Sequence, residues 1–125
     1  MEFTDDVVVA DFEAGVGTLT RLSDQRVDTV LVVAEPTPKS LEVGARAVAL
    51  ARERDVGRVI VVANRLRDAD DLATVVAAFP DCEVVAVPDD PKIVEADRKG
   101  VAPIDLAPDA PAVRALVGLA ESLAS

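Results

Sequence analysis

The sequence predicts an α/β fold built on a parallel β-sheet of about four strands with crossover helices. Half of the 125 residues are apolar and only 2% are aromatic, a composition that suits β-branched strands covered by Ala- and Leu-rich helices. Short apolar runs alternate along the chain with segments of helical periodicity, and each run is continuous, which indicates strands buried on both faces. Because the connections are short, we expect residues 1–125 to form a single domain.

The strands are predicted first, because their apolar runs are the clearest signal. These runs are Val7–Asp11, Thr29–Ala34, Val59–Ala63 and Glu83–Val87. They are rich in Val and Ile and do not alternate with polar residues, as expected for central strands of a parallel sheet.

Helices are predicted between and after the strands. Gly17–Ser23 is short, and Pro38–Arg54 has Thr37 as its N-cap and a proline at its first position. Asp70–Phe79 carries acidic residues in its first turn, where the helix dipole favours them. The remaining predicted helices are Pro91–Arg98, which stops at Gly100, and Pro111–Ala124, with an apolar stripe of Val113, Leu116, Val117, Ala120 and Leu123.

The topology raises the question of what covers the second face of the sheet. Right-handed crossovers between strands laid down in one direction place all crossover helices on the same face, which gives a two-layer sheet. The opposite face would then expose more apolar surface than a monomer usually does. We expect the helix Pro111–Ala124 or a second chain to cover it. The alternative is a change of strand direction, which places helices on both faces and gives three layers.

Charge and composition narrow the classes of function. The formal net charge is −10, which argues against nucleic-acid binding because no basic stripe is present to neutralise phosphates. No apolar stretch is long enough to span a membrane, and the acidic start lacks the order of a signal peptide, so we expect a cytoplasmic protein. The acid excess fits a halophilic, salt-rich cytoplasm and equally a GC-rich genome. The single Cys82 is expected to be a small buried hydrophobe.

The first candidate site follows the first predicted strand. In Asp11-Phe12-Glu13-Ala14-Gly15 the strand would carry Asp11 to the carboxyl edge of the sheet, where it could hold Mg²⁺ through a water. Gly15 would let its backbone N–H approach a γ-phosphate without a side chain in the way. This pattern is typical of P-loop nucleotidases. The alternative is that Asp11 caps the helix Gly17–Ser23.

Two later strand ends are candidates for binding a nucleobase. Asn64 follows the strand Val59–Ala63, and its carboxamide offers a donor and an acceptor side by side to an adenine edge. The backbone of Pro88 and Asp89, after the last strand, could frame the rim of the base. Both features have structural alternatives, since Asn64 could lie in an ordinary turn before an Asp68 N-cap and a Pro-Asp turn requires no ligand.

The order of these motifs resembles the MinD/ParA-type deviant-Walker ATPases. Val7–Gly15 is followed by Asp28–Val33, and the phrase from Asp11 to Gly15 most closely resembles the CooC-type branch that matures carbon-monoxide dehydrogenase. Val61–Arg65 and Val87–Asp90 continue the pattern, which corresponds to the carboxyl-terminal half of the family's domain. No G-x-x-x-x-G-K-[ST] loop is present, and the paired cysteines of the nickel-handling branch are also missing.

The resemblance implies roles for individual residues. Asp11 would be the Walker B-type aspartate, Gly15 the residue near the γ-phosphate, and Asn64 with the Pro88–Asp89 backbone would recognise the adenine of Mg-ATP. The family's ATP lies between two subunits, and its P-loop strand normally lies between the equivalents of Val7–Asp11 and Thr29–Ala34.

Three functions follow. In the first, the chain is a degenerate or complementary half of a MinD/CooC-like nucleotide-binding ATPase and does not hydrolyse ATP alone. It then acts either through self-association as a homodimer or through a P-loop-bearing partner. Alternatively it is the ATP-binding subunit of a two-chain ATPase, with the P-loop supplied in trans, or an α/β protein-binding module with no nucleotide.

Overall fold

A computed structural model describes residues 27–124, which form an α/β unit with a three-stranded parallel sheet in the order β1-β2-β3. The strands are β1 (Thr29–Ala34), β2 (Arg58–Leu66) and β3 (Glu83–Pro88). The predicted α/β class and parallel strand direction are therefore confirmed. The predicted strand Val7–Asp11 and helix Gly17–Ser23 lie outside the described residues.

The helices begin where the sequence supplies caps. Thr37 accepts from the Ser40 N–H at the start of α2 (Pro38–Glu53), and Asp68 caps α3 (Ala69–Ala78) by accepting from the Asp71 N–H at 2.9 Å. In α4 (Pro91–Lys99) the C-cap is Gly100 with φ 67°, a left-handed conformation that glycine adopts without strain. The short α5 (Pro103–Leu106) was not predicted, and α6 (Pro111–Ala124) has the predicted bounds.

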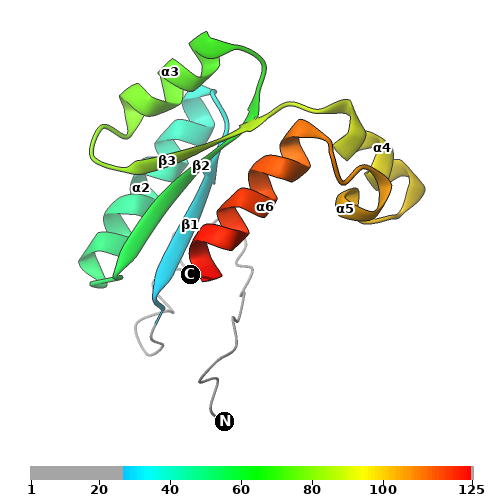
Figure 1. Cartoon of the computed structure of the whole chain (residues 1–125). Coiled ribbons are helices and arrows are strands. Elements are labelled where there is room, and N and C mark those ends of the chain that lie inside the picture. Colours follow the sequence, from blue (N-terminus) through cyan, green and yellow to red (C-terminus); the bar gives the residue numbers. More distant parts are fainter. Residues whose placement is uncertain (1–26, 125) are drawn as a thin grey trace.

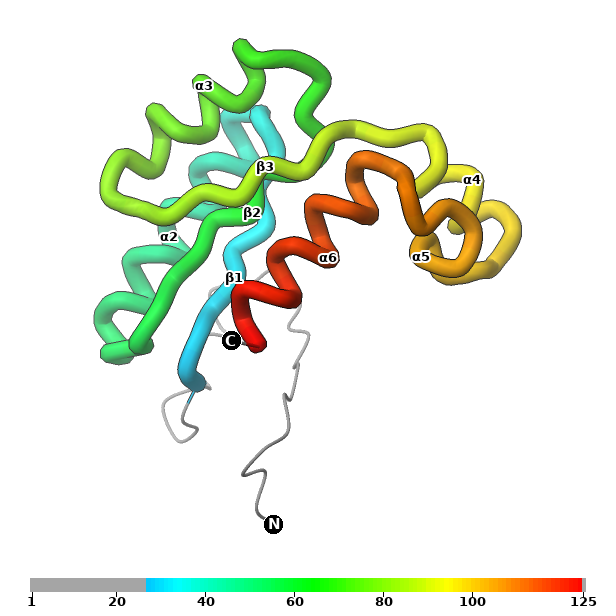
Figure 2. Tube along the Cα trace, in the orientation of Figure 1, coloured from blue at the N-terminus to red at the C-terminus, as the bar shows by residue number. Residues whose placement is uncertain are grey.

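The sheet lies between two layers of helices (Figure 1). On one face, α2 and α3 cover Val32, Val61 and Ala63, so both crossover helices share that face as predicted. On the other face, α6 packs on Ile60, Val62 and Val87. Figure 2 follows the chain from β3 through α4 and α5 and back along the sheet in α6. The terminal helix therefore folds back over the second face, as one of the alternatives predicted.

The face of α6 that packs on the sheet matches the predicted stripe only in part, because Val113 is buried and Leu123 packs on the core cluster of that face. Ala112 and Leu119 are buried against the strands, whereas Leu116 of the predicted stripe is 43% exposed and Ala120 is also exposed. Apolar residues occur nearly all round this helix, so its periodicity did not define one face. The small side chain of Ala112 lets the start of α6 approach the sheet closely.

The cover over the second face is partial. Leu31 and Val33 of β1 are 39% and 61% exposed, and their register partners Ile60 and Val62 on β2 lie in the core beneath α6. Within residues 27–124, β1 is also an edge strand, because only β2 pairs with it. Among the described residues, an unpaired strand edge and exposed apolar side chains therefore meet at β1.

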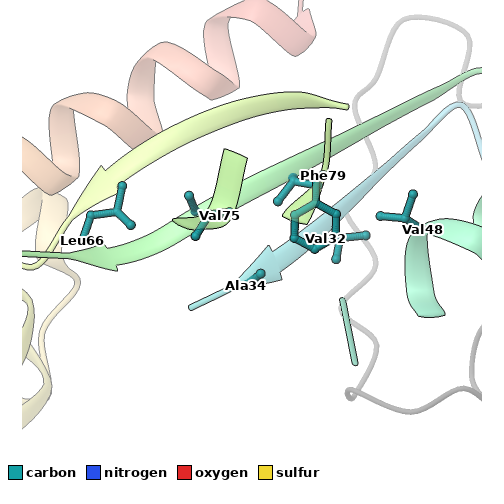
Figure 3. Close-up of a cluster of buried hydrophobic side chains, with 8 residues drawn as sticks. Val32, Ala34, Val48, Leu66, Val75 and Phe79 are labelled. Carbon is teal, nitrogen blue, oxygen red and sulfur yellow. The ribbon is translucent and has the colours of Figure 1, made fainter. Parts of the chain in front are cut away.

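The larger core lies between the sheet and α2 and α3 (Figure 3). Phe79 closes this core and lies beside Val32 and Ala34. A Cβ at Gly44 of α2 would lie 3.0 Å from Cζ of Phe79 and 3.6 Å from the Cβ of Ala34. Glycine at this position therefore lets α2 pack closely on β1.

We predict that Gly44→Val lowers the free energy of unfolding by about 1–3 kcal/mol, because the added side chain overpacks the core at Phe79. The matched control is Gly118→Val in α6, where an added Cβ meets no atom within 4 Å and stability should not fall. Urea unfolding of both variants measures the difference. Equal stability of the Gly44 and Gly118 variants would contradict the proposed close packing of α2.

A pH dependence is predicted from the pair that joins the starts of β2 and β3. Arg58 donates two hydrogen bonds to Glu83, at 2.7 and 3.1 Å, and holds the pKa of that carboxyl below its usual value of 4.5. A lowered folded-state pKa means that the stabilisation is present above pH 4.5 and disappears as the pH falls through the folded-state value. Glu83→Gln should therefore have a lower free energy of unfolding than the parent chain at pH 7. This difference between variant and parent should disappear as the pH falls below 4.5.

Urea unfolding between pH 7 and pH 3 measures this gap. Glu53→Gln is the control, since Glu53 is exposed and forms no ion pair with another described residue. A gap that stays constant over the whole pH range would show that the Arg58–Glu83 pair does not contribute.

Candidate functional site

The carboxyl ends of the three parallel strands bring polar residues to one edge of the sheet, where open α/β sheets bind ligands. Glu35 follows β1, Asn64 and Arg65 lie near the end of β2, and Pro88 ends β3 with Asp89 directly after it. We call these five residues the strand-end site.

Asn64 lies within β2, whereas the sequence predicted that it follows the strand, with an ordinary turn as the alternative. The strand β2 continues to Leu66, with a register shift between Ala63 and Leu66, because Leu66 pairs with Pro88 and accepts from the Asp89 N–H at 2.8 Å. Asp68 does cap α3, as the alternative interpretation expected. The Asn64 side chain is half-buried and forms no hydrogen bond with another residue in 27–124. Its amide donor and acceptor are therefore available.

Arg65 is a site residue that the sequence analysis did not single out. Its φ of 59° is a left-handed conformation that costs a non-glycine residue free energy, and it accompanies the irregularity that returns Leu66 to the core. The side chain is 64% exposed and lies 3.4 Å from Glu35 (Nη1–Oε1) and 3.8 Å from Asp89 (Nε–Oδ1). Arg65 thus links the ends of all three strands by weak, exposed ion pairs.

Pro88 and Asp89 offer fewer hydrogen-bonding groups to a base than the sequence predicted. Pro88 has no N–H, and the Asp89 N–H already donates to the Leu66 carbonyl. Backbone contacts from this turn to an adenine would therefore come from carbonyl oxygens. This restriction is not evident in the sequence, because it depends on the pairing of β3 with the extended end of β2.

Asp90, the next residue, is the only buried charged side chain in the described part of the chain. Its Oδ1 accepts from the Lys92 N–H at 3.0 Å and caps α4, while Oδ2 accepts from the Ala112 N–H at 3.1 Å. Ala112 lies in the first turn of α6, whose N–H groups have no acceptor within the helix. One carboxylate therefore caps two helices.

A shallow, open groove of about 600 Å³ lies beside Asp89 and runs along α4. It is lined by both signs of charge, including Arg65, Glu95 and Arg98. Glu95 lies 3.1 Å from both Lys99 and Lys92, and these two ammonium groups hold the pKa of its carboxyl below the usual value. The mixed charges do not favour a dedicated phosphate site here.

Asp11 and Gly15, the predicted magnesium and γ-phosphate residues, lie outside the described residues. Within residues 27–124, no group of three or more Cys, Asp or Glu side chains is arranged to hold a metal ion. The same range contains no helix that is both long and apolar enough to cross a bilayer.

Comparisons with known proteins show which proteins are similar to this chain. No protein-family model matches the chain. The carbon monoxide dehydrogenase accessory protein CooC of Rhodospirillum rubrum is 29% identical over 104 residues, and an uncharacterised ATP-binding protein of Methanocaldococcus jannaschii is 33% identical over 105 residues. Each alignment covers 82% of this chain and 40% of the relative. The chain thus spans well under half the length of these relatives.

The fold is also found in a solved structure. The MinD cell division protein of Aquifex aeolicus superposes with a TM-score of 0.68 at 24% identity, over 86% of this chain and 47% of that one. The parallel sheet, its flanking helices and this superposition define a partial P-loop NTPase fold. Together with the two sequence relatives, this superposition supports a MinD/ParA-type P-loop ATPase family, CooC-like, for the segment that the chain covers.

The left-handed backbone at Arg65 leads to a prediction that separates backbone strain from charge. Arg65→Gly and Arg65→Ala both remove the ion pairs to Glu35 and Asp89, but only glycine adopts a φ of 59° without steric cost. The glycine variant should therefore be more stable than the alanine variant by about 1 kcal/mol in urea unfolding. Asp55, with φ 58° after α2, is a second left-handed position, and its glycine and alanine variants should differ in the same direction. Equal stability of the two Arg65 variants would contradict this backbone conformation.

Proposed function

We propose that this chain is the base-binding part of a MinD/CooC-like ATP-binding unit and does not hydrolyse ATP alone. The phosphate loop would come from another polypeptide segment, in a P-loop-bearing partner or in the rest of a longer protein. The observation that carries the proposal is Asn64, which is half-buried at the carboxyl edge with its amide uncommitted to any described residue. The similarity to an ATP-binding protein over 82% of the chain supports it.

The strand-end site suits a purine base better than a phosphate. Asn64 offers a donor and an acceptor side by side, which matches the adenine edge. Arg65 is held by two weak ion pairs, so its guanidinium does not provide a desolvated cation for phosphate. We assign adenine recognition to Asn64 and to the carbonyl groups of Pro88 and Asp89.

Hydrolysis requires groups that the described residues do not supply. Phosphoryl transfer depends on a backbone cradle for the phosphates and on positive charge placed near them. Lys92 and Lys99 are both paired with Glu95, and Lys39 lies in the first turn of α2 without a glycine-rich loop around it. In our proposal Asp11 would hold Mg²⁺ through a water and Gly15 would approach the γ-phosphate once the phosphate loop is present.

The surface at β1 supports completion of the site by a further segment. Among the described strands, β1 pairs only with β2, and Leu31 and Val33 leave an apolar face beside that edge. A strand added at this edge would satisfy the β1 backbone and cover both side chains. We propose that a P-loop-bearing segment, or a second copy of the chain in a homodimer, binds here.

The test is calorimetric titration of Mg-ATP into the purified chain, with Mg-GTP as the comparison. We expect ATP-selective binding without ATP hydrolysis, and Asn64→Ala should weaken ATP binding about ten-fold through loss of the amide contacts. Thr74→Ala, which changes an exposed side chain on α3, is the control and should bind as the parent does. Far-UV circular dichroism checks that each variant is folded.

The outcomes separate the three candidate functions. ATP hydrolysis by the chain alone would contradict the proposal that it lacks a complete catalytic site. If the folded chain gave no heat with ATP, the nucleotide role would be rejected in favour of a protein-binding module. Sedimentation of the same sample distinguishes a homodimer from a monomer that requires a different partner.

A further inference from the structure

We infer that Asp90 is a positioning residue for the strand-end site and links that site to the docking of α6 on the sheet. This inference rests on the proposed function, because it assigns to α6 an influence on nucleotide affinity. Asp90 itself is not expected to touch the nucleotide, since both of its carboxylate oxygens are already bonded to backbone N–H groups.

Because Asp90 is buried, its hydrogen bonds constrain the positions of α4 and α6. The residue is 7% exposed, and a buried carboxylate is tolerated only where hydrogen bonds compensate for lost hydration. Its two acceptors meet the first turns of α4 and α6, where helix dipoles favour negative charge. Ala112 is 22 residues further along the chain, so this bond ties together two distant segments.

Asp89, the residue before Asp90, connects Asp90 to the strand-end site. The Asp89 N–H donates to the Leu66 carbonyl at 2.8 Å, so the turn after β3 is tied to the end of β2 at Asp89 and to α6 at Asp90. Leu66 follows Asn64 by two residues in the same strand. A displacement of α6 would therefore move Asp90, then the adjacent Asp89, and through the bond from Asp89 to Leu66 the end of β2.

The packing of α6 supplies a second connection. Ala112 and Leu119 pack in one cluster with Val87, the residue before Pro88, and with Val62 of β2. The same helix thus supports the last strand residues before the site. By reciprocity, if docked α6 is required for the arrangement that binds ATP, bound ATP must strengthen the docking of α6 by the same factor.

Two variants isolate the bond to α6. Serine and asparagine are both good N-caps, so Asp90→Ser and Asp90→Asn keep the cap on α4. The serine side chain is shorter by one atom and loses the Ala112 N–H, while asparagine has only one acceptor oxygen for two N–H donors. The matched control is Asp68→Asn, which changes an exposed N-cap of α3 whose side chain accepts from the Asp71 N–H.

The first measurement is made on the full chain without nucleotide, by amide hydrogen exchange and ¹H–¹⁵N NMR. In Asp90→Ser we expect exchange at Ala112 to rise about ten-fold or more, and the amide signals of Asn64 and Asp89 to shift. Asp68→Asn should change neither. Unchanged Asn64 and Asp89 signals in a folded Asp90→Ser chain would overturn the inference, because Asp90 would then hold α6 without positioning the site. If Asp90→Asn fails to fold, Asp90→Ser decides.

The second measurement adds Mg-ATP. In the parent chain ATP should slow exchange along α6, whereas Asp90→Ser should bind ATP about ten-fold more weakly and show less of this slowing. Equal ATP affinity of the parent and Asp90→Ser would overturn the inference. If the parent does not bind ATP, the proposed function fails, and the nucleotide-free shifts at Asn64 and Asp89 still decide whether Asp90 positions the strand ends.

Discussion

The pairing of β2 on both edges is the constraint on which the rest of the described structure depends. Its residues Ile60–Ala63 are all buried, two toward each layer of helices, so both cores are assembled on this one strand. The continuous apolar run follows from that position, because each residue meets either α2 and α3 or α6. Since the partners are parallel, the same pairing brings three strand ends to one edge and creates the strand-end site.

Regular pairing ends where the candidate site begins. After Ala63 the register of β2 with β3 shifts, Arg65 adopts a left-handed backbone, and Leu66 returns to the core with the Asp89 N–H bonded to its carbonyl. Irregular strand ends and left-handed residues concentrate at functional sites because they redirect side chains. Here the irregularity coincides with the one amide side chain on this edge, Asn64, which gives a physical reason to assign binding to this part of the sheet.

Within residues 27–124, the two helix layers cover the sheet to different extents. One layer covers β1 and β2 with α2 and α3, but on the other face α6 leaves Leu31 and Val33 of β1 exposed. Apolar side chains beside an edge strand favour association with a further segment. A phosphate-loop segment that completes the site is therefore supported by the surface chemistry of β1 as well as by the similarity to an ATP-binding protein.

The sequence by itself determined the α/β class, β1 to its exact residues, the approximate bounds of β2 and β3, and the helix starts at Pro38 and Pro91. These features depend on local patterns, namely apolar runs, N-cap side chains and prolines at first helical positions. Three features were decided only in the tertiary structure: the extension of β2 past Asn64, the face of α6 that packs on the sheet, and the bond from Asp90 to Ala112. Each depends on residues far apart in the chain, so neither periodicity nor propensity within one segment contains the information that specifies it.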